Sequence, residues 1–317
     1  MPHVLVVGRV VEEGLAVLRA RPDVTFDRID EGDPEAVRAL LPKADGLLVR
    51  TMKMPPDLLD TAPNLRVVSR HGVGYDNLDV GYLVQRRIPL AIAATSNAVS
   101  VAEHAFWMML ELAKRGREHE QALRSGNWAW RLGNHAIELG GRRVLLVGCG
   151  RTGRELARRA LAFDMTVDVF DPFAEAPEGC RKVEELEPAL GDADFVSLHL
   201  PRTAATVNLF NAAMLARMRP GAVLVNTARG GIVDERALAE ALASGHLRGA
   251  GLDVFDQEPP APGNPLLAAP NVLLTPHTAG VTAEAMLRMA IESAVNVLAG
   301  IDGKLDPGVV VNREVLT

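Results

Sequence analysis

Short apolar runs rich in Val, Ile and Leu alternate with helical patterns along almost the whole chain. Alternation of this kind predicts parallel sheets whose faces are covered by helices. In the first hundred residues a helix is predicted at Glu13–Ala20. The predicted strands of this part are Val4–Val7, Gly46–Val49, Leu65–Ser69 and Leu90–Ala93. Connections that contain Pro and Gly separate them.

The pattern changes at Ser96, where a longer helical stretch follows. Ser100-Val-Ala-Glu103 has the spacing of a capping box, in which Ser100 caps the helix N-terminus and Glu103 reaches back to Ser100. The apolar stretch Ala105–Leu112 continues this helix, and a polar stretch extends it to near Gly126. We therefore predict one long helix that carries the chain from one domain into the next.

Six further strands, with helices between them, predict a second doubly wound sheet. Helices are expected at Arg154–Phe163 and Glu235–Ser244. The predicted strands are Arg143–Val147, Thr166–Phe170, Phe195–Leu198, Ala222–Asn226, Gly249–Val254 and Val272–Thr275. The helical stretch Ala283–Ala299 and the tail Gly308–Asn312 come after this sheet and are expected to return to the first domain.

The composition is that of an ordinary water-soluble globular protein, long enough for two domains. Of the 317 residues, 48% are apolar and 23% are charged, and the formal net charge is −6. Arginines are scattered without a basic stripe, so a nucleic-acid partner is not expected. No stretch has the ~20 apolar residues of a membrane span, and the N-terminus does not resemble a signal peptide. The two cysteines, Cys149 and Cys180, lack metal-ligating neighbours, which favours a reduced, cytoplasmic location and no metal site.

A complete G-x-G-x-x-G sequence, Gly148-Cys-Gly150-Arg-Thr-Gly153, follows a predicted strand and precedes a helix. The first glycine permits a tight turn, the second lets the backbone approach a pyrophosphate, and the third lets the helix pack on the strand. The helix N-terminus offers free N–H groups to the phosphates. A glycine turn without a ligand is the alternative, but strand, turn and helix in this order indicate a dinucleotide site. We assign Gly148, Gly150, Arg151, Thr152 and Gly153 to it.

The next strand is followed by Asp171, 18 residues beyond Gly153. A carboxylate at this point accepts hydrogen bonds from both ribose hydroxyls of NAD and repels the 2′-phosphate of NADP. Pro172 and Phe173 come next, so no arginine directly follows Asp171 to bind that phosphate. The predicted cofactor is therefore NAD.

Three polar residues follow strand-like runs of the second domain: Arg229 in N-T-A-R-G, Glu258 in D-Q-E-P-P and His277 in T-P-H-T-A-G. Each residue could instead have an ordinary structural role. Arg229 could be a salt-bridge partner, Glu258 an exposed loop carboxylate, and His277 a histidine whose hydrogen bonds are satisfied at a strand end. Ligands of open α/β sheets bind outside the carboxyl ends of the strands, where these residues are expected. An Arg can hold a carboxylate, a His can move a proton, and a Glu can orient and charge that His. Beside a nicotinamide, the set suits reduction of a 2-keto acid.

With these segments in place, the chain resembles the D-isomer-specific 2-hydroxyacid dehydrogenase family, which includes phosphoglycerate dehydrogenase and hydroxypyruvate/glyoxylate reductases. The matching segments are G-C-G-R-T-G, V-N-T-A-R-G-G, G-L-D-V-F-D-Q-E-P-P and L-L-T-P-H-T-A-G, together with S-R-H-G-V-G-Y-D-N and S-V-A-E-H in the first part. The resemblance thus covers essentially the whole chain. It implies an α/β protein with a Rossmann NAD domain at 97–284 and a flavodoxin-like substrate domain that combines 1–96 with 285–317, and a cleft between them. The connections near Ser96 and Ala283 would then be hinges for closure.

The resemblance also implies roles for the site residues. Arg229 would clamp the substrate carboxylate and polarise the keto oxygen, His277 would transfer the proton, and Glu258 would stabilise the charged form of His277. The family's formate-oxidising members carry Gln in place of this Glu, so Glu258 argues against formate chemistry. Asp253 would lie near the nicotinamide carboxamide. His199 is expected to contribute its backbone rather than its imidazole, and further cofactor contacts are expected at Pro201, Thr206, Thr227, Ala228 and Ala279.

For the substrate, His71-Gly-Val73-Gly74 follows a predicted strand, and its small residues let backbone N–H groups converge on an anion. The resemblance selects Val73 and Gly74 as contacts to the substrate carboxylate, where an ordinary glycine turn is the alternative. Arg50, Lys53 and Arg70 lie at strand ends or in loops of the first domain, where they could bind a substrate phosphate or simply be solvated. We assign Arg50 and Arg70 to substrate binding.

The acceptor stays open between two classes. The chain ends at Thr317, and is expected to lack the regulatory extension of longer phosphoglycerate dehydrogenases. A small 2-keto acid such as hydroxypyruvate or glyoxylate is favoured, and 3-phosphohydroxypyruvate is the alternative. An NAD-sensing corepressor is the alternative of another functional class. Loss of Arg229, Glu258 or His277 would favour it, but all three residues are present. A homodimer through the long helix and a patch around Trp128 is expected from the family.

Overall fold

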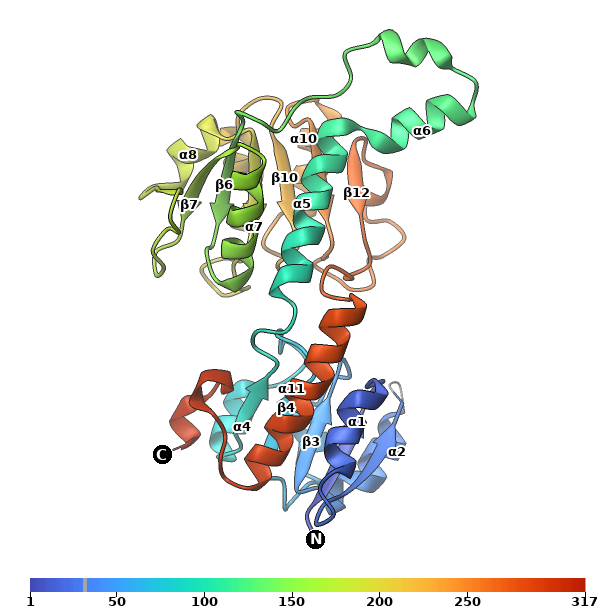
Figure 1. The fold of residues 1–317 in the computed structure, drawn as a ribbon, viewed down its shortest axis with the longest axis vertical. Coiled ribbons are helices and arrows are strands. Elements are labelled where there is room, and N and C mark those ends of the chain that lie inside the picture. The colour runs from blue at the N-terminus through green and yellow to red at the C-terminus, as the bar shows by residue number, and fades with distance from the viewer. Residues whose placement is uncertain (31–32, 317) are drawn as a thin grey trace. The chain divides into compact units, whose positions relative to one another are not determined.

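The computed structural model describes residues 1–30 and 33–316. The chain forms two compact units, of which one combines Met1–Asn97 with Val281–Thr317 and the other is Ala98–Gly280. The chain therefore passes twice from one unit to the other (Figure 1). Each unit is a parallel sheet with helices on both faces, which confirms the predicted α/β fold class.

The unit that contains the N-terminus is built on a five-stranded sheet in the order β2-β1-β3-β4-β5, which is the flavodoxin-like order. Helices α1 and α11 bury their apolar residues against one face, and α2, α3 and α4 cover the other. The strands are β1 (His3–Val7), β2 (Thr25–Ile29), β3 (Gly46–Val49), β4 (Val67–Arg70) and β5 (Leu90–Ile92). The helices are α1 (Glu12–Arg19), α2 (Pro34–Leu40), α3 (Pro56–Leu59), α4 (Val80–Gln85) and α11 (Ala283–Ile301), with 3₁₀ turns η1 (Leu41–Lys43), η4 (Pro307–Val309) and η5 (Arg313–Leu316).

The C-terminal segment lies against the edge strand β5 of this sheet. Val310 forms an antiparallel bridge with Ala91, and the Asn312 side chain accepts a hydrogen bond from the N–H of Leu90. At the opposite edge lies β2, a strand absent from the prediction. Its residues are exposed or only partly buried, so it lacks the apolar run by which the other strands were recognised.

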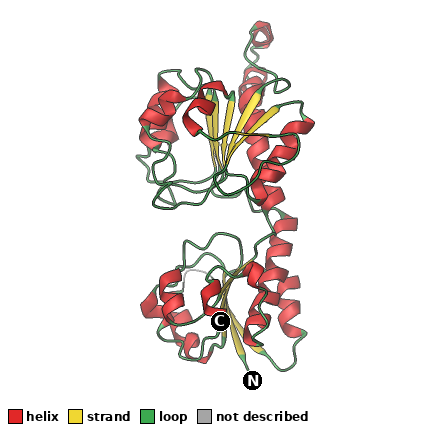
Figure 2. Cartoon of the chain, turned by 90° about the vertical axis from the view of Figure 1, so that its left-hand side faces the viewer, coloured by secondary structure: helices red, strands yellow, loops and turns green. Residues whose placement is uncertain are grey.

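The second unit is built on a seven-stranded sheet in the order β12-β11-β10-β9-β6-β7-β8, which is the Rossmann order with one strand added at its end. Helices α5 and α7 cover one face and α8, α9 and α10 the other, so the strands lie between two layers of helices (Figure 2). The strands are β6 (Arg143–Val147), β7 (Thr166–Phe170), β8 (Arg181–Lys182), β9 (Phe195–Leu198), β10 (Val223–Asn226), β11 (Gly249–Leu252) and β12 (Val272–Leu274). The helices are α5 (Ala98–Lys114), α6 (Gly116–Arg124), α7 (Arg151–Ala162), α8 (Leu186–Asp192), α9 (Ala212–Arg217) and α10 (Glu235–Ala243), with 3₁₀ turns η2 (Trp128–Leu132) and η3 (Pro265–Ala268).

The predicted capping box at Ser100 is wrong. Helix α5 already begins at Ala98, and Ser100 is buried within its first turns. Glu103 does not return to the helix N-terminus, because its Oε1 accepts a hydrogen bond of 2.8 Å from Arg159 on α7. Glu103, the last residue of the capping-box pattern, therefore connects α5 to α7.

The predicted single helix to Gly126 is also wrong, because it is broken at Arg115. This residue adopts a left-handed conformation with φ of 55°. Glu111 accepts the N–H of Arg117 through its side chain at 2.8 Å, and α6 starts afresh at Gly116. Helix α6 and the turn η2 after it then project away from the sheet of their own unit (Figure 1).

Candidate active site

The carboxyl ends of the strands of the seven-stranded sheet carry most of the predicted site residues. Because the strands are parallel and adjacent, the loops that follow them emerge along one edge. The residues that the structure brings to this edge are Gly148, Gly150, Arg151, Thr152 and Gly153 after β6, Asp171 after β7, His199, Pro201 and Thr206 after β9, Thr227, Ala228 and Arg229 after β10, Asp253 and Glu258 after β11, and His277 and Ala279 after β12.

The glycine-rich loop has the shape that a pyrophosphate needs. Gly148 has φ of 94°, and a Cβ there would lie 2.4 Å from the carbonyl oxygen of His199. A Cβ on Gly153 would lie 2.6 Å from the carbonyl oxygen of Gly148, so helix and loop approach too closely for a side chain. A Cβ on Gly150 would meet no atom within 4 Å. The protein's own packing therefore does not require Gly150, and the open space at the N-terminus of α7 fits a phosphate group bound by free N–H groups.

Asp171 is held against this loop by three backbone N–H groups. Its Oδ2 accepts from Cys149 at 2.7 Å, and its Oδ1 accepts from Phe173 at 2.8 Å and Ala174 at 3.0 Å. Burial acts to raise the pKa of Asp171, but these N–H groups outweigh it and leave the pKa below its usual value. A carboxylate has about four acceptor positions, so an ionised Asp171 keeps room for a ribose hydroxyl.

The loop after β9 and the residue after β10 carry further residues that were predicted to contact the cofactor. The imidazole of His199 is bonded to Ser197 at 2.9 Å, and burial lowers the pKa of His199 to about 4, so this ring is neutral. Thr206 closes its own loop, since its hydroxyl donates to the carbonyl of Pro201 at 2.7 Å. The hydroxyl of Thr227 is buried and has no hydrogen-bond partner among the residues that the structure describes. Such a group is costly unless a ligand satisfies it.

Glu258 and His277 form a direct pair. His277 Nδ1 lies 2.7 Å from Glu258 Oε2, and the other carboxylate oxygen accepts the N–H of Phe255 at 3.0 Å. The bond to Glu258 places the donor hydrogen on Nδ1 and leaves Nε2 as the nitrogen that can meet a substrate. The His277 side chain is 52% exposed, so this nitrogen can be reached.

The electrostatics of the pair favour a charged histidine. The hydrogen bond with Glu258 raises the pKa of His277 above its usual value, and burial and the charge of Arg229 only partly oppose it. For Glu258, burial acts to raise the pKa, but the bonds from His277 and Phe255 and the charge of Arg229 outweigh it and keep the carboxylate ionised. An acid whose pKa is moved toward or above neutral pH suits proton donation.

Arg229 lies close enough to this pair for its charge to act on both partners. Its backbone is fixed by Asn226, whose side chain donates to the Arg229 carbonyl at 2.9 Å and accepts from Ala228 at 3.0 Å. The next residue, Gly230, is required by packing, because a Cβ there would lie 1.7 Å from the carbonyl oxygen of Phe255. The loops that carry Arg229 and Glu258 are therefore in direct contact.

Asp253 organises the loop that carries His277. Its Oδ1 accepts from the Thr275 hydroxyl at 2.6 Å and from the Thr278 N–H at 2.8 Å, and its Oδ2 accepts from the Ala279 N–H at 2.8 Å. His277 sits between them with φ of 54° and donates its own N–H to the Asp253 carbonyl. Thr275 was not among the residues predicted from the sequence, although its hydroxyl, two residues before His277 at a strand end, was an available signal.

The remaining predicted residues belong to the other unit. Arg50 follows β3, Arg70 ends β4, and Val73 and Gly74 lie in the loop after β4. Arg50 donates to the carbonyl of Arg9 at 3.4 Å. Arg9, which follows β1, was not selected from the sequence. Since β1, β3 and β4 are neighbours, three arginines lie at adjacent carboxyl ends of this sheet.

Within residues 1–30 and 33–316, no group of three or more His, Cys, Asp or Glu side chains is placed so that it could hold a metal ion. In the same ranges, no helix has the length and apolar character to cross a membrane. Cys149 and Cys180 are both free thiols, and burial raises the pKa of Cys149 to about 11, which makes it unreactive.

Comparison with known proteins identifies the family of the chain. The sequence model described as D-isomer specific 2-hydroxyacid dehydrogenase, NAD binding domain, matches residues 106–279. A D-3-phosphoglycerate dehydrogenase from Mycobacterium leprae is 38% identical over 99% of this chain, and the chain spans 61% of that protein's length. A glyoxylate reductase from Thermofilum pendens is 35% identical over 99% of this chain and 96% of the relative.

A solved structure is similar over nearly the whole fold. The NADPH-dependent glyoxylate/hydroxypyruvate reductase from Sinorhizobium meliloti, in complex with NADP and malonate, superposes with a TM-score of 0.85. It is 32% identical, and the match covers 98% of this chain and 97% of the other. The family match and the nearly complete alignment to these oxidoreductases agree with the nucleotide fold and the glycine-rich loop. The chain belongs to the D-isomer specific 2-hydroxyacid dehydrogenase family.

Proposed function

We propose that the protein is an NAD-dependent oxidoreductase that interconverts a D-2-hydroxy acid and its 2-keto acid, and that Arg229, Glu258 and His277 carry the reaction. The observation that carries the proposal is the 2.7 Å pair between His277 Nδ1 and Glu258 Oε2, with the charge of Arg229 acting on both. These residues and the glycine-rich loop follow strands of the same parallel sheet, at its carboxyl edge.

In reduction of a keto acid, His277 donates a proton from Nε2 to the forming hydroxyl oxygen, and in oxidation it takes that proton back. The Glu258 carboxylate stabilises the charged imidazole and fixes its orientation. Arg229 binds the substrate carboxylate and polarises the keto oxygen. Bound at the glycine-rich loop, a nicotinamide cofactor supplies or accepts the hydride at the substrate carbon. In the other unit, Val73 and Gly74 are proposed to offer backbone N–H groups to a carboxylate.

NAD is the proposed cofactor, although the relative from S. meliloti is named for NADPH. Asp171 is ionised and sits at the end of β7. A negative charge at this position attracts ribose hydroxyls and repels a phosphate. Asp253 and Thr227 are proposed to contact the nicotinamide end, where the Thr227 hydroxyl lacks a partner among the described residues.

Hydroxypyruvate or glyoxylate is the proposed keto acid. Glu258 opposes formate oxidation, because formate has no hydroxyl proton for His277 to accept. A second candidate, 3-phosphohydroxypyruvate, is favoured by Arg9, Arg50 and Arg70, which lie at the carboxyl ends of β1, β3 and β4. Arginine is well suited to bind a phosphate, so the position of these three residues is the basis of this alternative.

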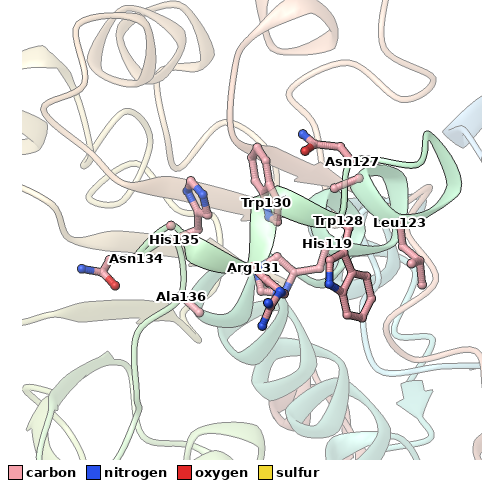
Figure 3. Close-up of a pocket in the computed structure, with 11 residues that line it drawn as sticks. His119, Leu123, Asn127, Trp128, Trp130, Arg131, Asn134, His135 and Ala136 are labelled. Carbon is pink, nitrogen blue, oxygen red and sulfur yellow. The ribbon is translucent and has the colours of Figure 1, made fainter.

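A homodimer through α5, α6 and the Trp128 region is also proposed. A hollow of about 590 Å³ opens beside η2, where Trp130 stacks on His135 with ring centroids 4.0 Å apart (Figure 3). Leu123, Trp128 and Leu132 nearby expose 62%, 65% and 76% of their surface. Exposed apolar side chains gathered on a projecting segment are typical of an interface. A cytoplasmic location is proposed from the two free thiols.

The test is turnover of a panel of keto acids by the purified protein. Loss of NADH absorbance is followed with glyoxylate, hydroxypyruvate, 3-phosphohydroxypyruvate and pyruvate, and the panel is repeated with NADPH. Turnover of an unphosphorylated keto acid with NADH supports the proposal. Selective turnover of the phosphorylated acid selects the second candidate. No turnover of any keto acid, despite NADH binding, contradicts the proposal.

A further inference from the structure

The loop that carries Glu258 has little packing of its own. Residues 256–264 contain no helix or strand, and most of them are exposed. They connect β11 to the turn η3. A loop of this kind is not held by apolar burial, so polar contacts at its ends decide where Glu258 lies.

Glu235 binds both ends of this loop through one carboxylate. Its Oε1 accepts the N–H of Asp256 at 2.7 Å, and its Oε2 accepts from Asn264 Nδ2 at 2.5 Å. The orientation of the Asn264 amide is fixed, because its Oδ1 accepts the N–H of Leu266 at 3.0 Å. Each end of the loop is therefore bonded to the same side chain.

Glu235 is itself mounted on a rigid element. It is the first residue of α10, directly after the N-cap Asp234, whose side chain accepts from Ala237. Leu238 and Leu242 of the same helix are buried in the core. Because α10 is anchored in the core, a carboxylate on this helix can hold a loop that lacks apolar packing of its own.

Glu235 is linked to Glu258 through the backbone N–H groups of two consecutive residues. The N–H of Phe255 binds Glu258 Oε1 at 3.0 Å, and the N–H of the next residue, Asp256, binds Glu235. The second oxygen of Glu258 then meets His277. Asp256 also pairs with Arg202 at 3.1 Å, but both side chains are substantially exposed, and such pairs contribute little.

We infer that Glu235 is a positioning residue, which holds both ends of the Glu258 loop and thereby keeps the Glu258 carboxylate on His277. The inference deepens the proposed function and rests on it for its effect on turnover. Glu235 touches neither partner of the pair, so its effect is expected on the charge state of His277 and on kcat/KM, with little change in NADH affinity.

The test compares four variants. Glu235→Ala frees both ends of the loop, and Asn264→Ala frees one. In Glu235→Gln the amide keeps an acceptor for the Asp256 N–H but presents a donor to Asn264, so an intermediate effect is expected. Glu240→Ala is the matched control, since Glu240 lies on the same helix and its exposed side chain binds Arg236 at 3.2 Å.

Two readouts separate positioning from general destabilisation. The first is the titration of the His277 imidazole by NMR, in which the pKa falls toward its ordinary value in Glu235→Ala, less in Asn264→Ala, and not in Glu240→Ala. The second is the pH profile of kcat/KM for reduction, whose decline moves to lower pH in the same order. A displacement of about 1 Å at a catalytic group can cost about 100-fold, so a loss of roughly 10- to 100-fold is expected for Glu235→Ala.

An unchanged His277 titration in folded Glu235→Ala overturns the inference, whether or not the protein reduces a keto acid. If Glu235→Ala does not fold, an unchanged titration in Asn264→Ala overturns it instead. A wild-type protein that turns over no keto acid, but whose His277 titration falls in Glu235→Ala, contradicts the proposed function and supports the positioning role.

Discussion

Replacing Glu258 with Gln removes one charge from the site while keeping the size of the side chain. The amide oxygen can still accept the Phe255 N–H that Glu258 Oε1 accepts now. The charged form of His277 loses the carboxylate 2.7 Å from its Nδ1, so the pKa of His277 falls. Reduction needs the protonated imidazole, which the wild type retains to higher pH than the variant.

The size of the effect follows from distance and exposure. The two side chains are 52% and 37% exposed, so the dielectric constant of water is closer to the truth than that of a protein interior. Two unit charges 2.7 Å apart then attract each other by about 1.5 kcal/mol, and about 1.4 kcal/mol is tenfold in an equilibrium. At alkaline pH the protonated fraction of His277, and with it kcat/KM for reduction, should be about tenfold lower in the variant.

The assay is kcat/KM against pH in both directions. In acid, where His277 is protonated in both proteins, reduction by wild type and variant should converge, and the difference should open as the pH rises. Oxidation needs neutral His277, so its profile should move the same way on the pH axis and favour the variant at low pH. An equal loss at every pH in both directions would refute the electrostatic reasoning and leave Glu258 a purely structural role.

Four other outcomes are expected. Gly230→Ala puts a Cβ 1.7 Å from the Phe255 carbonyl oxygen and should lower kcat/KM by about 100-fold, whereas Gly263→Ala, with no atom within 4 Å, should match wild type; equal activities would contradict the loop contact. Asp171→Ala should weaken NADH binding by about 10- to 100-fold and raise the NADPH/NADH ratio in a fluorescence titration, and an unchanged ratio would rule against Asp171 as the selector. Asp168 is fully buried and pairs with both Arg143 and Arg181. Asp168→Ala should lower the free energy of unfolding by up to about 3 kcal/mol and the Tm by roughly 6–12 °C; an unchanged Tm would be inconsistent with a stabilising role of these ion pairs. Trp128→Ala should shift light-scattering mass toward the monomer, and an unchanged mass would remove Trp128 from the interface.

The buried strands could be predicted because strands covered on both faces have continuous apolar sequences. β9 and β10 are buried at every residue and were found within a residue of their ends. β2 and β8 were not, since β2 is only partly buried and β8 is the dipeptide Arg181–Lys182. β8 is held by the bond of Arg181 to the buried Asp168, 13 residues earlier, which no local pattern reveals.

The helix break at Arg115 has a similar cause. Gly116 follows the break, but a single glycine is tolerated within a helix. The left-handed turn depends on the Glu111 side chain, which accepts the Arg117 N–H. At the site, Arg229, Glu258 and His277 could be selected because strand ends share an edge. Glu235, which holds the Glu258 loop, could not, since it meets Asp256 and Asn264 across 21 and 29 positions.

His277 is proposed to move the substrate proton, and His277→Asn removes the imidazole that would do so. Asn tolerates the left-handed conformation that His277 adopts, so the loop should survive. On the best keto acid of the panel, we expect a loss of about 10²- to 10⁴-fold in kcat with NADH affinity unchanged. Turnover within a few-fold of wild type would contradict it.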